Sequence, residues 1–286
     1  MKFDRNARRA WVNYVASAAT LACVVLALIP LGSIVWTAAV RGGQVLSVHF
    51  LTAPEPTGCV PGDCQIGGIG PAIEGTFAVV ALASLIAMPV GVLAGVYLSE
   101  FGRHRMGRTL SFLTDVLTGV PSIVVGAFVY SLFVLYDRPL VFSVISGAIA
   151  LSLVMIPIVT RTSEEALRLV PDSIREASLA LGIPKFRTTT RVVLRTGGSA
   201  LLTGAVLAVM RGGGETAPLI LTLFGSRFGF SGLAQPGGAL PLTIYYSGIS
   251  PASNQVADAW GAALVLILIM LGISLVARVI LRRRLA

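Results

Sequence analysis

The chain has 286 residues, of which 55% are hydrophobic and only 12% are charged. Its mean hydropathy of +0.85 excludes an ordinary water-soluble globular domain and places the chain in a bilayer. A net charge of +9 would suit a nucleic-acid surface in a soluble protein. Here the positions of the basic residues indicate a membrane orientation instead.

Six apolar segments are long enough to cross the membrane, because a helical span needs about 20 mostly apolar residues. They lie at about 12–40, 71–99, 110–136, 140–160, 199–224 and 256–281. The first has a long apolar run and no small-residue cleavage site before Arg41, so we interpret it as a retained anchor. We therefore expect an all-α membrane protein with six transmembrane helices.

The basic residues predict the orientation of these spans. Eighteen of the 22 lysines and arginines lie in the N-terminal tail, after the second span, between the fourth and fifth spans, or at the C-terminal end. The positive-inside rule makes these regions, and hence both termini, cytoplasmic. The opposite side carries Cys59 and Cys64 in "CVPGDC", where a small disulfide loop and two free thiols both remain open. No histidine or second cysteine pair accompanies them, so we expect no metal site.

The longest cytoplasmic segment, about 161–198, contains "PDSIREASLALGIP". Ser173 and Glu176 have the spacing of a capping box at a helix start, and Gly182 suits the left-handed position after a helix end. This pattern predicts a helix of about two turns over 174–181. A helix so short is marginal in water and must dock, either on the ends of its own spans or in a groove of a separate cytoplasmic protein.

"EASLALG", from Glu176 to Gly182, resembles the E-A-A-x-x-x-G signature of the membrane subunits of bacterial ABC importers, with Ser178 in place of the second alanine. The signature normally ends in I-x-L-P, and Arg195 stands where the final proline would be. The resemblance implies that this is the coupling helix, with Glu176, Ala177 and Gly182 as its signature residues, which sits in a cleft of a separate ATPase.

Two further stretches narrow the resemblance. "GVPSIVVG" at 119–126 and "GETAPLI" at 214–220 are similar to the A-type permease of phosphate-specific ABC transporters, over a region from about residue 71 to the C-terminus. The resemblance implies a type I ABC importer permease fold, with residues 1–70 as tail, first helix and external loop, and 71–286 as the permease domain. It implies import of inorganic phosphate across the bacterial inner membrane, without a cofactor. The expected partners are a cytoplasmic ABC ATPase dimer, a C-type permease, an extracytoplasmic phosphate-binding protein and membrane lipid.

"RGGGE", from Arg211 to Glu215, is costly inside a span. An arginine at the centre of a span costs about 2.5–3.5 kcal/mol, and each helix glycine adds up to about 1 kcal/mol relative to alanine. We predict that Arg211 faces the substrate pathway and attracts the anion, because a guanidinium matches a tetrahedral oxyanion, while Glu215 orients Arg211. The alternative is that Arg211 and Glu215 form an ion pair that only neutralises their own charges. If the helix unwinds at the glycines, their N–H groups would also be free for an anion.

Other charged residues have simpler interpretations. By resemblance Arg161 is a second pathway candidate, although an arginine at a span boundary can be a positive-inside anchor. Glu164 and Glu165 fit a solvated helix start, and Asp115 and Asp258 fit boundary or packing positions. "GVLAG", at 91–95, is a close-packing G-x-x-x-G motif.

The chain lacks the motifs of an enzyme, so we expect no catalytic residues. Its only lysines, Lys2 and Lys185, do not follow a glycine, so no standard P-loop is present, and ATP hydrolysis would belong to another polypeptide. Two alternatives to a phosphate importer remain. One is an ABC permease for sulfate or molybdate, and the other is an ion-coupled secondary transporter or anion channel, which would need no coupling helix.

Overall fold

The computed structural model describes residues 5–55, 67–102, 104–225 and 229–285. Within these ranges the chain is helical and forms no strand, apart from one isolated bridge between Phe224 and Gly237. The expected all-α fold is confirmed for this part of the chain. Cys59 and Cys64 lie outside the described residues.

In the described part of the chain, four helices are long and apolar enough to cross a membrane, namely α1 (Arg5–Thr37), α4 (Gly70–Phe101), α7 (Val144–Arg168) and α14 (Ser253–Leu285). They coincide with the first, second, fourth and sixth predicted spans. The first span continues through the short π-helix η1 (Ala38–Gly42) and α2 (Gly43–Val45). Helix α7 continues past the predicted end at residue 160, so the start of the expected cytoplasmic segment is helical.

The third predicted span is wrong as a continuous helix over 110–136. The structure has α5 (Arg105–Gly119) and α6 (Ser122–Tyr136), which are bent by 101° at their junction. Val120 is extended, with ψ 128°, and is followed by Pro121, which has no N–H to continue the helix. A short 3-10 turn, η2 (Arg138–Leu140), then leads to α7.

The fifth predicted span, 199–224, is also interrupted, and a bend in the chain precedes it. A helical stretch made of α9 (Lys185–Arg187), η3 (Thr188–Val193) and α10 (Leu194–Thr196) meets α11 (Gly198–Gly213) at 69°. The chain then leaves the helix and resumes as α12 (Ala217–Thr222). If each bent pair counts as one span, the described residues give up to six, which is the expected number.

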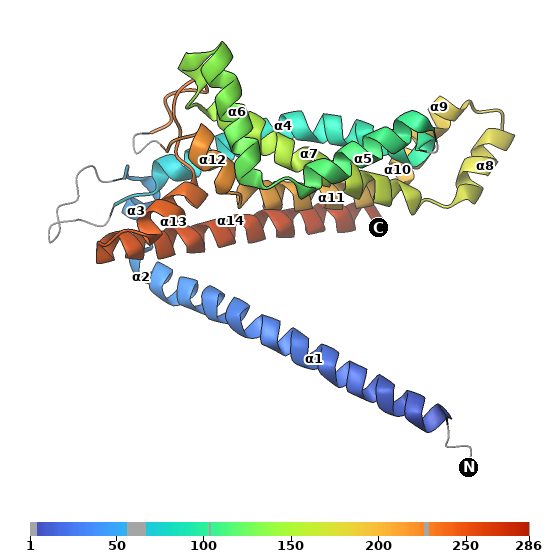
Figure 1. Ribbon diagram of the computed structural model, residues 1–286, viewed down its shortest axis with the longest axis horizontal. Helices are drawn as coiled ribbons and strands as arrows, with labels where there is room; N and C mark the ends of the chain where they lie inside the picture. The colour runs from blue at the N-terminus through green and yellow to red at the C-terminus, as the bar shows by residue number, and fades with distance from the viewer. Residues whose placement is uncertain (1–4, 56–66, 103, 226–228, 286) are drawn as a thin grey trace.

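The main core lies where α4, α7 and α11 run side by side (Figure 1). Apolar side chains fill it, among them Val79, Ala83, Leu151, Met155 and Ala208. Helices α4 and α7 make the most extensive contact. A Cβ built on Gly91 would lie 2.6 Å from Val159 Cβ, and one on Gly95 would lie 2.5 Å from Ser163 Cβ. The G-x-x-x-G motif is therefore confirmed as a helix contact within the chain.

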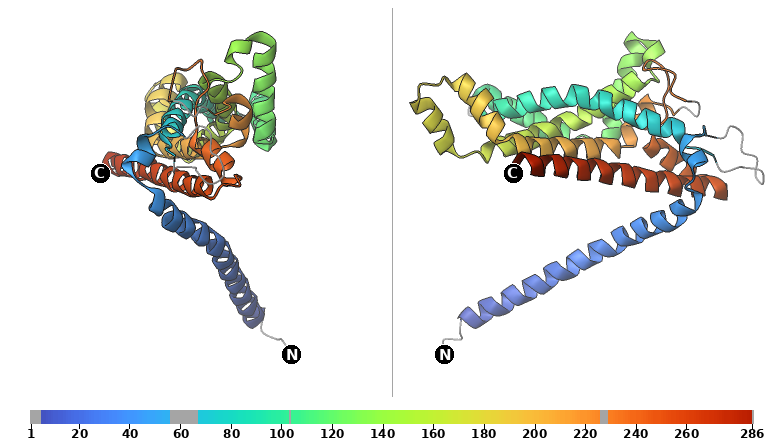
Figure 2. Two further views of the ribbon diagram at one scale, coloured as in Figure 1. Left: turned by 90° about the vertical axis from the view of Figure 1, so that its left-hand side faces the viewer. Right: turned by 180° about the vertical axis from the view of Figure 1, so that it is seen from behind.

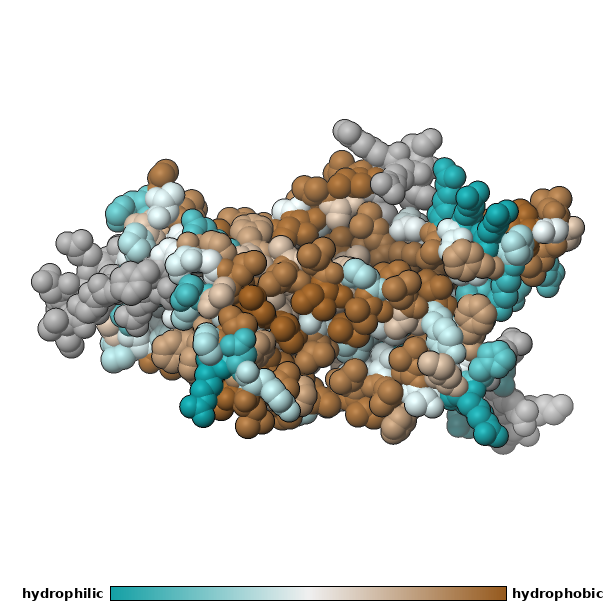
Figure 3. Space-filling view, turned by 90° about the horizontal axis from the view of Figure 1, so that it is seen from above, coloured by the Kyte–Doolittle hydropathy of each residue, from teal (hydrophilic) through white to brown (hydrophobic). Residues whose placement is uncertain are grey.

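The two ends of the molecule carry different elements. Helices α8 (Asp172–Ala180) and α9 lie at one end, and α3 (Val48–Thr52) and α13 (Leu240–Gly248) lie at the other (Figures 1 and 2). Both chain termini lie towards the α8 end. Figure 3 shows a broad hydrophobic band across the middle of one face, with hydrophilic residues gathered towards both ends. This is the distribution expected of a protein that spans a bilayer.

Helix α1 stands apart from the other helices in every view of Figures 1 and 2. None of its most apolar window is buried inside this chain, whereas 61% of the corresponding window of α7 is buried. The surface of α1 therefore contacts lipid or another protein.

Candidate translocation site and coupling helix

The break between α11 and α12 places the "RGGGE" sequence at the end of a helix. Helix α11 ends at Gly213, the N–H of Gly214 donates to Arg211 O at 3.2 Å, and the N–H of Glu215 donates to Gly212 O at 3.1 Å. The helix does unwind here, as the glycines suggested. The N–H of Gly214 is nevertheless engaged in a turn, so the expectation that it is free for an anion is wrong.

The glycines themselves have a packing role that the sequence did not reveal. A Cβ on Gly212 would lie 2.7 Å from Met155 Sδ, and one on Gly213 would lie 2.3 Å from Met270 Cε. A side chain at either position would therefore have to displace the flexible end of Met155 or Met270. The cost of glycine in this helix is offset by close approach to two neighbours.

Arg211 and Glu215 form the expected ion pair, with Arg211 Nε 2.9 Å from Glu215 Oε1. The side chain of Arg211 is 66% exposed and that of Glu215 is 13% exposed. Among the described residues this is the one hydrogen bond of the guanidinium, so both terminal NH2 groups remain open to an anion. The pair orients the arginine without saturating it.

Arg161 lies in a denser network, which joins α7 to α5. Its Nη1 donates to Glu164 Oε2 at 2.7 Å, and its Nη2 donates to the Ser111 hydroxyl at 2.8 Å and also to Asp115. Glu164 accepts a second ion pair from Arg168 at 2.6 Å. The expectation of a solvated Glu164 is wrong, because this carboxylate is buried between two arginines. Asp115 likewise forms an ion pair with Arg161, so it does more than mark a span boundary.

The two candidate arginines belong to separate networks at different levels of the helix pair α7 and α11. Gly204 packs on Thr162 and Gly212 packs on Met155, so the two helices run antiparallel. Arg161 is one residue from Thr162, and Arg211 is one residue from Gly212. With a rise of about 1.5 Å per residue, the two arginines are roughly 9 Å apart along the helix axis.

The predicted motif helix is present as α8, close to the expected range of 174–181. It begins after Pro171 without a side-chain cap, so Ser173 lies in the first turn and the predicted capping box is wrong. Its end is as predicted. Gly182 has φ +76°, its N–H donates to Leu179 O at 2.9 Å, and Ile183 N–H donates to Ser178 O at 3.3 Å. These two bonds form a Schellman motif, which requires the left-handed residue.

Helix α8 docks on its own chain through one face and leaves the other open. Arg175 forms an ion pair with Glu100 at the end of α4, and the buried Ser178 hydroxyl lies 2.9 Å from that of Thr188. The signature residues Glu176 and Ala177 are exposed. Docking on its own chain is therefore confirmed, and docking of the open face in a separate protein stays a prediction.

Comparisons with known proteins agree with this architecture. Residues 87–284 match the family "Binding-protein-dependent transport system inner membrane component". The phosphate transport system permease protein PstA of Yersinia pestis is 37% identical over 285 residues, which cover 98% of this chain and 95% of that protein. The protein of the same name from Xylella fastidiosa strain Temecula1 is 42% identical over 228 residues, which cover 79% of each chain.

Solved structures show the same fold at low sequence identity. A chain of the inward-facing MetNI methionine ABC transporter has a TM-score of 0.60 and 17% identity, covering 74% of this chain and 95% of that chain. A chain of a bacterial ABC transporter involved in alginate import has a TM-score of 0.59 and 14% identity, covering 98% of this chain and 99% of that chain. These likenesses confirm the expected ABC importer permease fold. The family match and the two relatives above establish that the chain belongs to the PstA family of phosphate transport system permeases.

Proposed function

We propose that this permease forms half of the pathway of an ATP-driven phosphate importer, and that Arg211 is the residue that receives the anion. The relatives that carry the phosphate transport name match nearly the whole chain. The observation that carries the assignment of Arg211 is its exposed guanidinium at a helix break, which the described part of the chain holds through Nε alone. Two parallel N–H groups of its terminal NH2 pair match two oxygens of a phosphate, which an ammonium group cannot do.

Glu215 has a second role in this proposal. A lone arginine beside a low-dielectric pathway would bind a dianion tightly and release it slowly. The carboxylate 2.9 Å from Arg211 Nε offsets part of that attraction and fixes the direction of the side chain. We therefore assign Glu215 as the group that tunes the hold of Arg211 on the substrate.

Arg161 is the second proposed pathway residue. Its bonds to Ser111, Asp115 and Glu164 occupy most of its N–H donors. An anion that reached Arg161 would therefore have to displace a carboxylate, most readily that of the exposed Asp115. Such an exchange would move charge between α7 and α5 as phosphate passes.

The proposed partners follow from the surfaces that the chain leaves open. The exposed side of α8, with Glu176, Ala177 and the turn at Gly182, would sit on a cytoplasmic ABC ATPase dimer. The uncovered α1 suits contact with a C-type permease that completes the pathway, with lipid over the remaining apolar surface. An extracytoplasmic phosphate-binding protein would deliver the substrate at the end that carries α3 and α13. In this arrangement both termini are cytoplasmic.

The test is phosphate uptake by the assembled transporter reconstituted in liposomes, with ATP inside and binding protein outside. Arg211→Ala should abolish uptake while the complex still assembles and hydrolyses ATP, because a fixed positive partner for the anion is lost. Uptake at the wild-type rate would show that Arg211 has no pathway role. Competition by sulfate or molybdate at equal concentration would support the other oxyanions, and uptake without ATP would support a channel or secondary transporter.

A further inference from the structure

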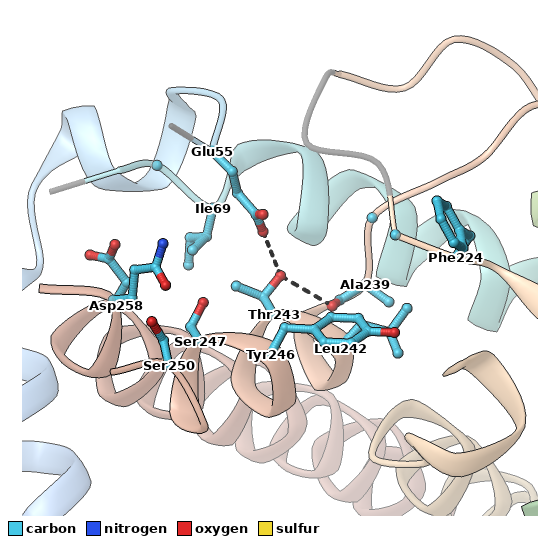
Figure 4. Close-up of a pocket in the computed structure, with 14 residues that line it drawn as sticks. Glu55, Ile69, Phe224, Ala239, Leu242, Thr243, Tyr246, Ser247, Ser250 and Asp258 are labelled. Carbon is cyan, nitrogen blue, oxygen red and sulfur yellow. Dashed lines mark hydrogen bonds between the residues drawn. The ribbon is translucent and has the colours of Figure 1, made fainter. Parts of the chain in front are cut away.

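A polar cavity of about 540 Å³ (Figure 4) opens beside α13, at the end of the molecule opposite α8 (Figure 1). It lies between the segment after α3, helix α13 and the first turns of α14. Its polar lining consists of Glu55, Thr243, Tyr246, Ser247, Ser250, Gln255 and Asp258. None of these residues belongs to the pathway or to the coupling helix proposed above, so the cavity needs an explanation of its own.

Asp258 is the unusual member of this lining. It is only 6% exposed, and its Oδ2 accepts one long hydrogen bond, from the N–H of Gly67 at 3.4 Å. Its Oδ1 is buried and has no hydrogen-bond partner among the described residues. A buried carboxylate oxygen without a partner is costly, because it has lost its hydration and gained nothing in return. The arrangement therefore indicates a ligand that supplies the missing positive charge.

The charge of the cavity decides the sign of that ligand. Two carboxylates face the cavity, and its described lining contains no lysine, arginine or histidine. Glu55 Oε1 accepts a hydrogen bond from Thr243 Oγ1 at 2.7 Å, which holds this carboxylate at the cavity wall (Figure 4). A phosphate dianion would be repelled here, so the cavity is not a second substrate site. A cation would be attracted.

The donor atoms decide the kind of cation. All of the polar side chains in the lining offer oxygen, as carboxylate, hydroxyl or amide groups, and hard divalent cations prefer such ligands. No group of three or more His, Cys, Asp or Glu side chains able to hold a metal occurs among the described residues. That argues against a tight cage of protein ligands. Magnesium commonly keeps several waters and uses only one or two carboxylates, and at about 30 Å³ per water this cavity has room for such a hydrated ion.

We propose that this outer cavity binds a hydrated divalent cation of the Mg²⁺ class, with Asp258 as its principal anionic ligand. The ion would join three separate segments, namely the chain around Glu55, helix α13 and helix α14. It would also cancel the negative charge of Asp258 at the outer end. An anion transporter gains from this, because an uncompensated carboxylate at Asp258 would repel an approaching phosphate.

The full-length chain in lipid nanodiscs, without nucleotide, provides the test. Mn²⁺ serves as a paramagnetic stand-in for Mg²⁺, and electron paramagnetic resonance separates free from bound ion. We expect one saturable site per chain, displaced by Mg²⁺ but not by Na⁺ at matched ionic strength. Asp258→Asn should weaken Mn²⁺ binding at least tenfold. Asp137→Asn, which removes an exposed carboxylate outside the cavity, should leave it unchanged.

Three results would overturn the proposal. They are the absence of saturable Mn²⁺ binding to the wild-type chain, equal binding by the Asp258→Asn and wild-type chains, and displacement by Na⁺ as effective as that by Mg²⁺. If Asp258→Asn is not recovered in folded form, Glu55→Gln replaces it as the variant, and binding weakened severalfold is then expected. Unchanged binding in Glu55→Gln would count against the site. Because no transport is measured, the outcome is independent of the role of Arg211.

Discussion

Arg175 Nε donates to Glu100 Oε1 across 3.1 Å and thereby fastens helix α8 to the end of helix α4. Both side chains are largely buried, with 17% and 6% of their surfaces exposed. The same guanidinium donates to the carbonyls of Leu167 and Val170, at the end of α7. One side chain therefore joins the motif helix to the two helices that make the most extensive contact in the core. A displacement of α8 would be passed directly to both.

Glu100→Gln should uncouple ATP hydrolysis from phosphate uptake. The change keeps the shape of the side chain but removes a charged partner, and hydrogen bonds to charged groups contribute about 1.5–3 kcal/mol. We expect uptake to fall at least tenfold while the complex still hydrolyses ATP, measured side by side in proteoliposomes.

Asp172→Asn is the matched control for that experiment. Asp172 lies at the same distance of 3.1 Å from the Arg175 guanidinium, but its side chain is 88% exposed. Exposed ion pairs contribute about 0–1 kcal/mol, so uptake should change by less than about threefold. Equal effects of the two substitutions would show that Arg175 does not transmit movement through Glu100.

The effect of a substitution at Gly182 should depend on how readily the new residue adopts a left-handed backbone. It has φ +76°, and a built Cβ meets nothing within 4 Å inside this chain. An L-residue in the left-handed region costs about 1–2 kcal/mol, and asparagine costs less than alanine. We expect uptake to fall in the order Gly, Asn, Ala, with Gly182→Asp inactive because a charge would face the ATPase.

Gly198→Ala is the control for this series, because Gly198 also has open space around it but lies in a helix with ordinary φ. It should transport like the wild type. If Gly182→Ala transports equally well, the left-handed turn is not needed for coupling.

Much of the helical framework could be predicted from hydropathy, and the reason is physical. The length and apolarity of a segment determine its free energy of transfer from water into the bilayer, so α1, α4 and α14 lie where the apolar runs lie. The end of α8 could be predicted because Gly182 is one of the few residues that accept a left-handed backbone without cost. These features depend on local sequence alone.

The remaining features depend on contacts between distant segments. The 101° bend between α5 and α6 does not change the apolarity of the run, and only Pro121 gave a sign of it. The burial of Glu164 could have been suspected, because Arg161 and Arg168 stand three and four residues away on the same helix. The cavity around Asp258 could not, because its walls come from segments almost 200 residues apart.

Gly95→Val should break the contact between α4 and α7. A Cβ at this position would lie 2.5 Å from Ser163 Cβ and 2.8 Å from the carbonyl oxygen of Thr160, which cannot swing aside. Overpacking of this kind costs about 1–3 kcal/mol, so the variant should unfold at a lower temperature in detergent and yield less assembled complex. Gly272→Val, at a position with nothing within 4 Å, should keep the wild-type melting temperature. A similar loss in both variants would point to a general effect of valine in spans rather than to this contact.

Substitutions of Arg211 and Glu215 should separate substrate binding from release. Arg211→Lys keeps the charge but not the planar fork, so the KM for phosphate should rise at least tenfold with assembly unchanged. Glu215→Gln should do the reverse, because the guanidinium loses the carboxylate that lies 2.9 Å away and holds the dianion more strongly. We expect a lower KM together with a lower kcat, since release then becomes slower. Initial rates of phosphate uptake over a range of concentrations measure both constants. A Glu215→Gln variant with raised KM and unchanged kcat would mean that Glu215 only positions Arg211, and that its charge does not limit how long the anion stays bound.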